Sequence, residues 1–403
     1  LRLTDQRYGD EDVSVADALL DLTDLYLVQA RHAEALPLAE RSLAIRQRLL
    51  GPEHVDTGYA LDRLARIHHA RSRYADAEPL FRRFLEIMIR QYGEKHSDVG
   101  IARQALGNLY LDQARYAEAE AQLRQGLAIS EAVDGKDHPF LAGPLTALAR
   151  LHLERGELDT AEPLLARARQ LLEQKLGAEH VDLIEIYSVL GYLELARKSY
   201  AAAEEHYNRA IALTEQVYGP DYPDLIDPLV NLARGSVARE DFRKAEDLLD
   251  RAITLGDRGG APEFRFRAYL TRARLSWSRE RPGEAIADLR TAMSLAEQQR
   301  ANFSGAETER AGTFAEFAEA FEQMVAWQAD RGGLNEALAA MDRARARSLL
   351  DEFALAGADL DAGQSAAQRE QRKARETALK VEIADIERNL QALAADEDLA
   401  LED

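Results

Sequence analysis

A glycine recurs every 42 residues over the first half of the chain, and this period limits the possible folds more than any other feature. The glycine occupies positions Gly9, Gly51, Gly93, Gly135, Gly177 and Gly219. Two more columns keep the same spacing, a leucine from Leu22 to Leu232 and an alanine from Ala35 to Ala245. Three such columns over six units predict a repeat array in which each unit packs on its neighbours.

Each unit carries the apolar pattern of two helices. In the unit that begins at Gly93, the stripe from Leu106 to Tyr110 has helical spacing, residues 113–116 interrupt it, and residues 117–129 resume it. The position after the repeated leucine is small in most units, which would let the two helices of a pair approach closely: Ala65, Gly107, Ala149, Gly191 and Ala233. Three prolines are expected in the first turn of the second helix, where a missing N–H costs little: Pro37, Pro79 and Pro163.

These residues resemble the tetratricopeptide (TPR) family. The 42-residue unit, with starts such as "GKDHP" (135–139) and "GPDYP" (219–223), is similar to the kinesin light chain type. The resemblance covers roughly residues 1–296. It implies an all-α fold, a right-handed superhelical solenoid of helical hairpins, which a C-terminal helical hairpin and a charged helix would follow.

The period also predicts a division of the chain. Residues 1–299 are expected to form the TPR solenoid, with a partial repeat at 1–9, six 42-residue units and one degenerate unit. Because residues 1–9 align with 43–51, the end of a second helix, we expect the chain to begin inside a repeat with at least one helix upstream. Residues 300–357 read as a long helical hairpin. Residues 358–403 read as a loop and a charged amphipathic connector helix that packs on another surface, with a dimer zipper as the alternative.

A second resemblance lies in this C-terminal region. The stretch "EALAAMDRARARSLLDEF" (336–353) is similar to the last hairpin before the CHAT domain of bacterial TPR–CHAT proteins. In that family a TPR array precedes a caspase-like cysteine protease fold. The resemblance implies that this chain is the regulatory half of such a protein, with a CHAT protease domain downstream in the same polypeptide as one partner. The protease's catalytic dyad has no counterpart here, because the chain contains no cysteine.

Composition narrows the function classes. The net charge of −20 disfavours nucleic acid as a direct partner, because phosphate binding needs a basic surface. Without cysteine the chain forms no disulfide and has no thiolate ligand or nucleophile, and no apolar run approaches the ~18 residues of a membrane span. The sequence therefore favours a cytoplasmic, non-enzymatic protein with no cofactor, no metal and no membrane partner.

Four histidines follow the repeated glycine at one spacing: His54, His96, His138 and His180. Neighbouring helices pack roughly 8–10 Å apart, whereas zinc–nitrogen bonds are about 2.0–2.1 Å, so the four cannot share one ion. We therefore interpret them as part of a loop-to-helix junction in which the glycine supplies unusual backbone angles. His68 and His69 read as helix-surface residues.

The remaining candidate site is the concave face of the solenoid, which the first helices line in TPR arrays. Arginine and asparagine side chains there suit a carboxylate or an extended peptide backbone. The candidate partner-binding residues are Arg63, Arg66, Asn108, Arg150, Tyr192, Asn231 and Arg234. The alternative for these positions is a solvated, partly salt-bridged face without a ligand.

The sequence thus predicts a protein–protein interaction scaffold. On the CHAT resemblance it is the regulatory or sensing module of a caspase-like protease, which binds a protein or peptide on the concave face or at the C-terminal hairpin. The alternative is a stand-alone peptide-binding adaptor of the kinesin light chain type with no enzymatic domain.

Overall fold

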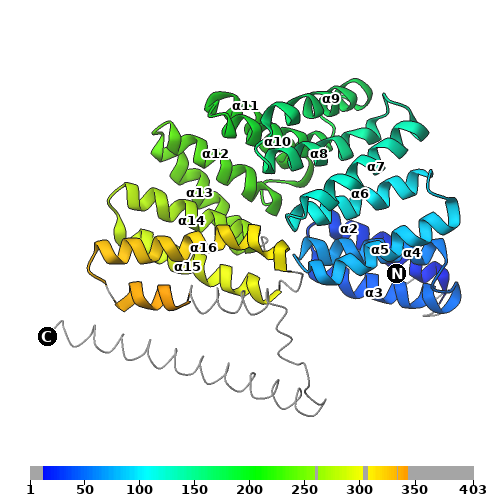
Figure 1. Ribbon diagram of the computed structural model, residues 1–403, viewed down its shortest axis with the longest axis horizontal. Helices are drawn as coiled ribbons and strands as arrows, with labels where there is room; N and C mark the ends of the chain where they lie inside the picture. The colour runs from blue at the N-terminus through cyan, green and yellow to red at the C-terminus, as the bar shows by residue number, and fades with distance from the viewer. Residues whose placement is uncertain (1–11, 259–261, 303–306, 334, 344–403) are drawn as a thin grey trace, which may run out of the picture. The chain divides into compact units, whose positions relative to one another are not determined.

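The computed structural model describes residues 12–258, 262–302, 307–333 and 335–343. Its α-helices follow one another in pairs, and successive helices pack side by side (Figure 1). The first helices are α2 (Val13–Val28), α4 (Val55–Ala70), α6 (Ser97–Asp112), α8 (Ala142–Glu154), α10 (Leu183–Ala196), α12 (Ile226–Ala238) and α14 (Pro262–Ser278). The second helices are α3 (His32–Leu49), α5 (Tyr74–Tyr92), α7 (Tyr116–Asp134), α9 (Leu158–Leu176), α11 (Tyr200–Tyr218), α13 (Phe242–Asp257) and α15 (Pro282–Asn302).

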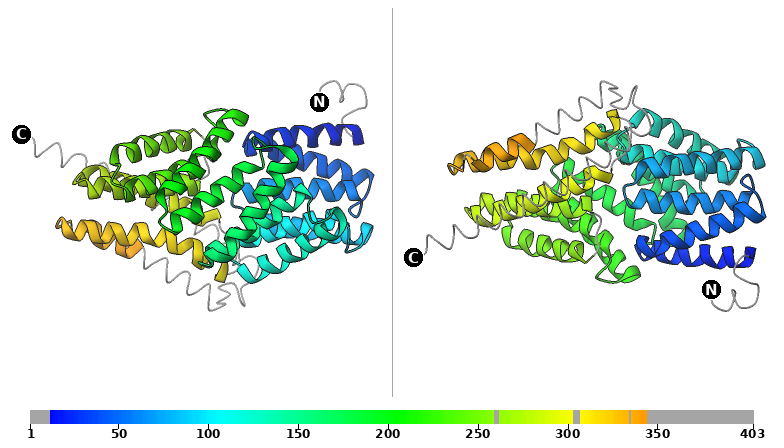
Figure 2. Two further views of the ribbon diagram at one scale, coloured as in Figure 1. Left: turned by 90° about the horizontal axis from the view of Figure 1, so that it is seen from above. Right: turned by 90° about the horizontal axis from the view of Figure 1, so that it is seen from below.

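The pairs stack in chain order, as Figure 2 shows from the blue to the yellow helices. Short 3-10 turns, η1 (Pro139–Leu141) and η2 (Pro223–Leu225), lead into α8 and α12. This architecture confirms the predicted all-α repeat solenoid. Among the described helices, none has the length and apolar character to cross a membrane.

One further helix, α16 (Glu307–Asp330), packs on α15 after the seventh pair. The indole rings of Trp277 on α14 and Trp327 on α16 stack with centroids 4.5 Å apart and an interplanar angle of 3°. Residues 335–343 are again helical. The predicted 300–357 hairpin falls partly on these elements. The predicted connector at 358–403 lies outside the described residues.

The repeated columns form the core between the helices of each pair. The alanine column is buried, and so are the leucines from Leu64 to Leu232. A Cβ added at Gly107 would lie 2.6 Å from Leu123, and one added at Gly191 would lie 2.7 Å from the Tyr207 ring. The expectation that small residues allow close approach is therefore confirmed, because the large side chain of the facing helix fills that space.

A single left-handed residue closes each hairpin. It directly follows the first residue past each first helix: Ala30 (φ +55°), Ser72 (+56°), Ala114 (+58°), Gly156 (+74°), Lys198 (+61°), Glu240 (+62°) and Glu280 (+57°). In the third pair, the Arg115 N–H beyond it donates to the Tyr110 carbonyl at 2.8 Å, which satisfies one of the carbonyls that a helix end leaves free. Six of the seven positions hold a side chain in a conformation that favours glycine.

The expected place of the three prolines is wrong. Pro37, Pro79 and Pro163 lie at the sixth residue of α3, α5 and α9, inside each helix and not in its first turn. The reason is the left-handed residue, which reverses the chain so sharply that the second helix begins only two residues later. Each proline therefore removes one backbone hydrogen bond from its helix.

The repeated glycine ends the second helix in the second, third, fourth and fifth pairs. Gly93, Gly135, Gly177 and Gly219 have φ between +80° and +94° and ψ between 159° and 166°. Only glycine adopts this region readily. The predicted junction, with glycine supplying the unusual backbone angles, is confirmed.

Candidate functional site

First helices of successive pairs contact one another, for example α6 with α8, α8 with α10 and α10 with α12. Side chains from several repeats therefore meet on one surface, which we call the first-helix face. All seven predicted binding residues lie on the helices of this face, from Arg63 on α4 to Arg234 on α12.

Two of the predicted arginines are paired with acids at the N-terminal end of this face. Arg63 Nε donates to Asp24 Oδ1 at 2.8 Å and its Nη1 donates to Asp62 Oδ2 at 2.7 Å, while Arg66 Nε donates to the same oxygen at 2.8 Å. Burial alone would lower the pKa of Arg63, but the bond to Asp24 and the charge of the buried Asp62 outweigh it and raise that pKa. Both guanidinium groups are thus neutralised within the chain.

A second chain of charges crosses four first helices. Arg150 Nη2 donates to Asp112 Oδ1 at 3.0 Å, its Nη1 lies 3.7 Å from Glu185, and His69 Nε2 lies 2.7 Å from Asp112 Oδ2. Burial would raise the pKa of Asp112, but the charge of Arg150 and the His69 hydrogen bond lower it. The carboxylate therefore stays ionised and holds Arg150 in place. The prediction that His68 and His69 are surface residues is wrong, since His69 reaches into this network and the side chains of both are largely buried.

Arg234 has a different environment. Its Nη1 donates to Asn231 Oδ1 at 3.0 Å, and Asn231 Nδ2 donates to Asp227 Oδ2 at 3.2 Å. Asn231 is buried, with 8% of its surface exposed. Within the part of the chain that the structure describes, no carboxylate lies within ion-pairing distance of Arg234. A fixed amide thus orients a guanidinium whose charge is not neutralised by a direct ion pair.

Of the other two predicted residues, Tyr192 lies close to Arg234 and Asn108 lies further along the first-helix face. Tyr192 lies one repeat before Arg234 in the same column, and burial, with the charge of Glu154, raises the pKa of its hydroxyl, so it stays a neutral donor. Asn108 lies two repeats before Tyr192, and its Oδ1 is buried without a hydrogen-bond partner among the described residues. The face between α10 and α12 therefore offers a cation and a hydroxyl to an anionic or amide group.

The repeated histidines serve the junctions. Each accepts a backbone N–H through Nδ1 near the start of the next first helix: His54 from Asp56 (3.2 Å), His96 from Asp98 (3.2 Å), His138 from Phe140 (3.3 Å) and His180 from Asp182 (3.3 Å). The imidazole thereby satisfies a donor that the helix start leaves free. The described residues contain no group of three or more His, Cys, Asp or Glu side chains arranged to hold a metal ion.

One ladder of ion pairs between repeats did not emerge from the sequence. A glutamate directly follows the repeated alanine in five units, and each pairs with an arginine of the next repeat: Glu78 with Arg115 (2.8 Å), Glu120 with Arg155 (2.7 Å), Glu162 with Arg197 (2.8 Å), Glu204 with Arg239 (2.6 Å) and Glu246 with Arg281. The 42-residue spacing of these glutamates was the available signal. Their partial exposure makes each pair a modest contribution.

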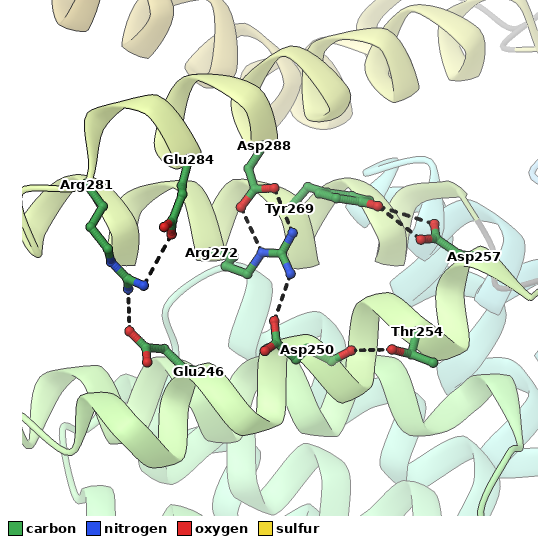
Figure 3. A network of polar contacts seen from close by, with 9 residues as sticks. All are labelled: Glu246, Asp250, Thr254, Asp257, Tyr269, Arg272, Arg281, Glu284 and Asp288. Atoms are coloured by element: carbon green, nitrogen blue, oxygen red, sulfur yellow. Dashed lines mark hydrogen bonds and ion pairs between the residues drawn. The ribbon is translucent and has the colours of Figure 1, made fainter.

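The seventh pair is tied to the sixth by a denser network (Figure 3). The seventh pair follows the sixth after 40 residues and not 42, and with this shift of two residues Arg272 occupies the position of the repeated leucine, 40 residues after Leu232. Its guanidinium donates twice to Asp288 on α15, at 2.8 Å in each bond, and once to Asp250 on α13 at 2.8 Å (Figure 3). A two-pronged ion pair thus replaces an apolar contact of the other units.

The paired helices, the left-handed hairpin turns and the repeated core columns define a TPR scaffold. More particularly, the family model described as the MalT-like TPR region matches residues 11–304, so the chain belongs to that family. The TPR prediction is confirmed. No curated protein matches the chain.

Among solved structures, the chain is similar to a Rap protein complexed with Competence and Sporulation Factor, at 10% identity and a TM-score of 0.53, over 85% of this chain and 100% of that one. It also resembles BtubC (BKLC) from P. vanneervenii, at 20% identity and a TM-score of 0.42, over 57% and 89%. A putative kinesin light chain of Podospora anserina matches at 23% identity and a TM-score of 0.40, over 51% and 98%. At 10% identity, the likeness to the Rap protein concerns the fold alone.

Proposed function

We propose that this chain is a scaffold that binds a protein or peptide on the first-helix face, with the ligand's carboxylate held between α10 and α12. One observation carries the proposal. Arg63, Arg66 and Arg150 are paired with acids of the chain, whereas Arg234 has no such partner among the described residues. A guanidinium matches the two oxygens of a carboxylate with parallel hydrogen bonds.

The surroundings of Arg234 support this role. Because Asn231 already holds one of its nitrogens, the side chain loses less rotamer freedom when a ligand binds. The neutral Tyr192 hydroxyl supplies a further donor nearby. The Rap protein with this fold was solved in complex with Competence and Sporulation Factor. That complex illustrates the class of function that we assign here.

At a finer level, we propose that the chain is the cytoplasmic regulatory module of a bacterial CHAT-type protease. The support is the stretch at 336–353, of which residues 336–343 are helical as in a hairpin arm. A partner on the first-helix face or at that hairpin would shift the position of the protease domain, because repeats contact only their neighbours and transmit displacements along the array. The alternative is a stand-alone peptide adaptor of the kinesin light chain type.

The binding proposal is tested with a peptide library displayed with free C-termini. A selected peptide, labelled at its N-terminus, is titrated against the chain by fluorescence anisotropy. Charge-assisted hydrogen bonds contribute about 1.5–3 kcal/mol, so Arg234→Ala should weaken binding by roughly ten- to a hundredfold. Arg66→Ala is the matched control and should have little effect, because Arg66 is engaged by Asp62.

Amidating the peptide's C-terminus should reproduce the loss caused by Arg234→Ala. Unchanged affinity in both cases would refute the carboxylate site. The CHAT proposal has a separate test, since the gene beyond codon 403 must encode a domain with a histidine and a cysteine. Its peptidase activity must also change when the selected peptide is added. A gene without such a domain would leave the adaptor function.

A further inference from the structure

An arginine that bridges two carboxylates in one repeat is replaced by a tyrosine in the next. Arg150 on α8 donates to Asp112 on α6 at 3.0 Å and lies 3.7 Å from Glu185 on α10. The residues 42 positions later keep the two acids and replace the arginine by an aromatic residue: Glu154, Asp227 and Tyr192. The acids are thus retained in the next repeat, whereas the cation that bridges them is not.

Both of the retained acids lie close to the Tyr192 side chain. Glu154 ends α8 as Asp112 ends α6, and it precedes Tyr192 by 38 residues, the separation of Asp112 from Arg150. Burial raises the pKa of the Tyr192 hydroxyl, and the charges of Glu154 and Asp227 raise it further. The repeat therefore places two carboxylates around this tyrosine in the way that it places two around Arg150.

A second tyrosine lies next to Glu154. Tyr116, the first residue of α7, packs against a core cluster to which α8 contributes, and burial, followed by the charge of Glu154, raises the pKa of its hydroxyl. Asp227 already accepts from Asn231 and lies 3.6 Å from Arg267, so Glu154 is the acid on which the inference rests. Glu154 is exposed, and a carboxylate beside aromatic rings offers a cation both a charge partner and a π face.

We propose that the position between Glu154 and Tyr192 takes a cationic side chain of the ligand, as the equivalent position one repeat earlier takes Arg150. The inference rests on the proposed function, because it starts from a ligand carboxylate held at Arg234. Neighbouring helices pack roughly 8–10 Å apart, and an extended chain advances roughly 3.3 Å per residue. A ligand with its carboxylate at Arg234 thus brings one of its last three residues to Tyr192, one repeat away. The first-helix face therefore recognises a peptide with an arginine or lysine among its last three residues.

The test uses the peptide that the wild-type chain selects from the free-C-terminus library, and a copy in which the basic residue among the last three is replaced by norleucine. Fluorescence anisotropy gives the two affinities. Their ratio should be roughly fivefold to tenfold, because a cation–π contact and an exposed ion pair each contribute modestly. Glu154→Gln, at an exposed position that should leave the fold intact, should make the two affinities equal. Tyr192→Arg should do the same, because it rebuilds the arrangement around Arg150 and fills the position from within the chain.

A matched control is needed because the net charge of −20 attracts any basic peptide. Glu179→Gln removes one charge from an exposed position in the junction before α10, and the wild-type ratio should be retained. Selected peptides without a basic residue among the last three overturn the inference. So does a ratio that survives Glu154→Gln, or one that Glu179→Gln lowers equally. A failure of the carboxylate site itself is recognised separately, as affinity unchanged by Arg234→Ala and by amidation, and it overturns both proposals.

Discussion

Glycine occurs both at the ends of second helices and in one of the hairpin turns, and the two positions allow a quantitative prediction about backbone strain. Gly135 ends α7 with φ +89° and ψ 159°, and Gly156 closes the next hairpin with φ +74°. A Cβ added at either position meets no atom within 4 Å. The cost of Gly135→Ala and Gly156→Ala therefore comes from the backbone alone. At Ala114, the counterpart of Gly156 one repeat earlier, alanine already adopts φ +58°.

The magnitudes follow from these angles. The left-handed helical region costs an L-residue about 1–2 kcal/mol, and alanine recovers about 0.4–1 kcal/mol by restricting the unfolded chain. Gly156→Ala should thus destabilise by about 0.5–1 kcal/mol, and Ala114→Gly should stabilise by a similar amount. The region of Gly135 belongs almost only to glycine, so Gly135→Ala should cost more, about 2 kcal/mol.

The assay is equilibrium urea unfolding followed by far-ultraviolet circular dichroism. Gly283→Ala in α15 is the control, because its Cβ is equally unobstructed but its φ is not positive. That variant should be stabilised by about 0.5–1 kcal/mol through helix propensity. The expected order of midpoints is Gly135→Ala, Gly156→Ala, wild type, then Ala114→Gly. If the urea midpoints of all three glycine-to-alanine variants increase together, the argument from backbone conformation is wrong.

Two further predictions concern charge. Arg272→Ala leaves the largely buried Asp288 unpaired and should lower the free energy of unfolding by about 2–3 kcal/mol, measured by tryptophan fluorescence in urea. Arg272→Leu combined with Asp288→Leu should stay within about 1 kcal/mol of wild type, and a double variant as unstable as the single one would contradict this. Burial lowers the pKa of His32, His68 and His206. Near neutral pH the folded chain therefore binds fewer protons than the unfolded chain, and the free energy of unfolding should fall as the pH drops from 7.5 through about 6.5. Replacing all three by glutamine should flatten that decline between pH 7.5 and 5.5 in melting experiments, and an unchanged slope would exclude these histidines as its source.

Much of the fold could be predicted from the sequence because the residues that determine it recur every 42 positions. The 42-residue columns predict paired helices, the small residue at Gly107 and the junction at Gly93, and the structure agrees. The position of the prolines within the second helices could not be predicted, and the reason is physical. The residues that close the hairpins, such as Ala114 and Glu240, adopt a left-handed conformation without the glycine that normally signals it.

The sequence predicted which residues line the candidate site, but it did not predict how their charges are paired. Arginines on the first helices are visible at their period, yet their partners lie on other columns and, for Arg63 and Arg150, also on other repeats. Asp24 is 39 residues from Arg63, and Asp112 is 38 residues from Arg150. Only the packing of neighbouring first helices shows that these arginines are neutralised and that Arg234 lacks a carboxylate partner among the described residues.

Hydrogen–deuterium exchange with the peptide selected from the free-C-terminus library tests the central claim most directly. If the first-helix face between α10 and α12 binds the peptide, amide exchange should slow in segments 183–196 and 226–238. Arg234→Ala should abolish that protection. Exchange in the second helices on either side, α9 and α13, should change little. Protection confined to second helices or to the junction loops, with α10 and α12 unchanged, would contradict the account.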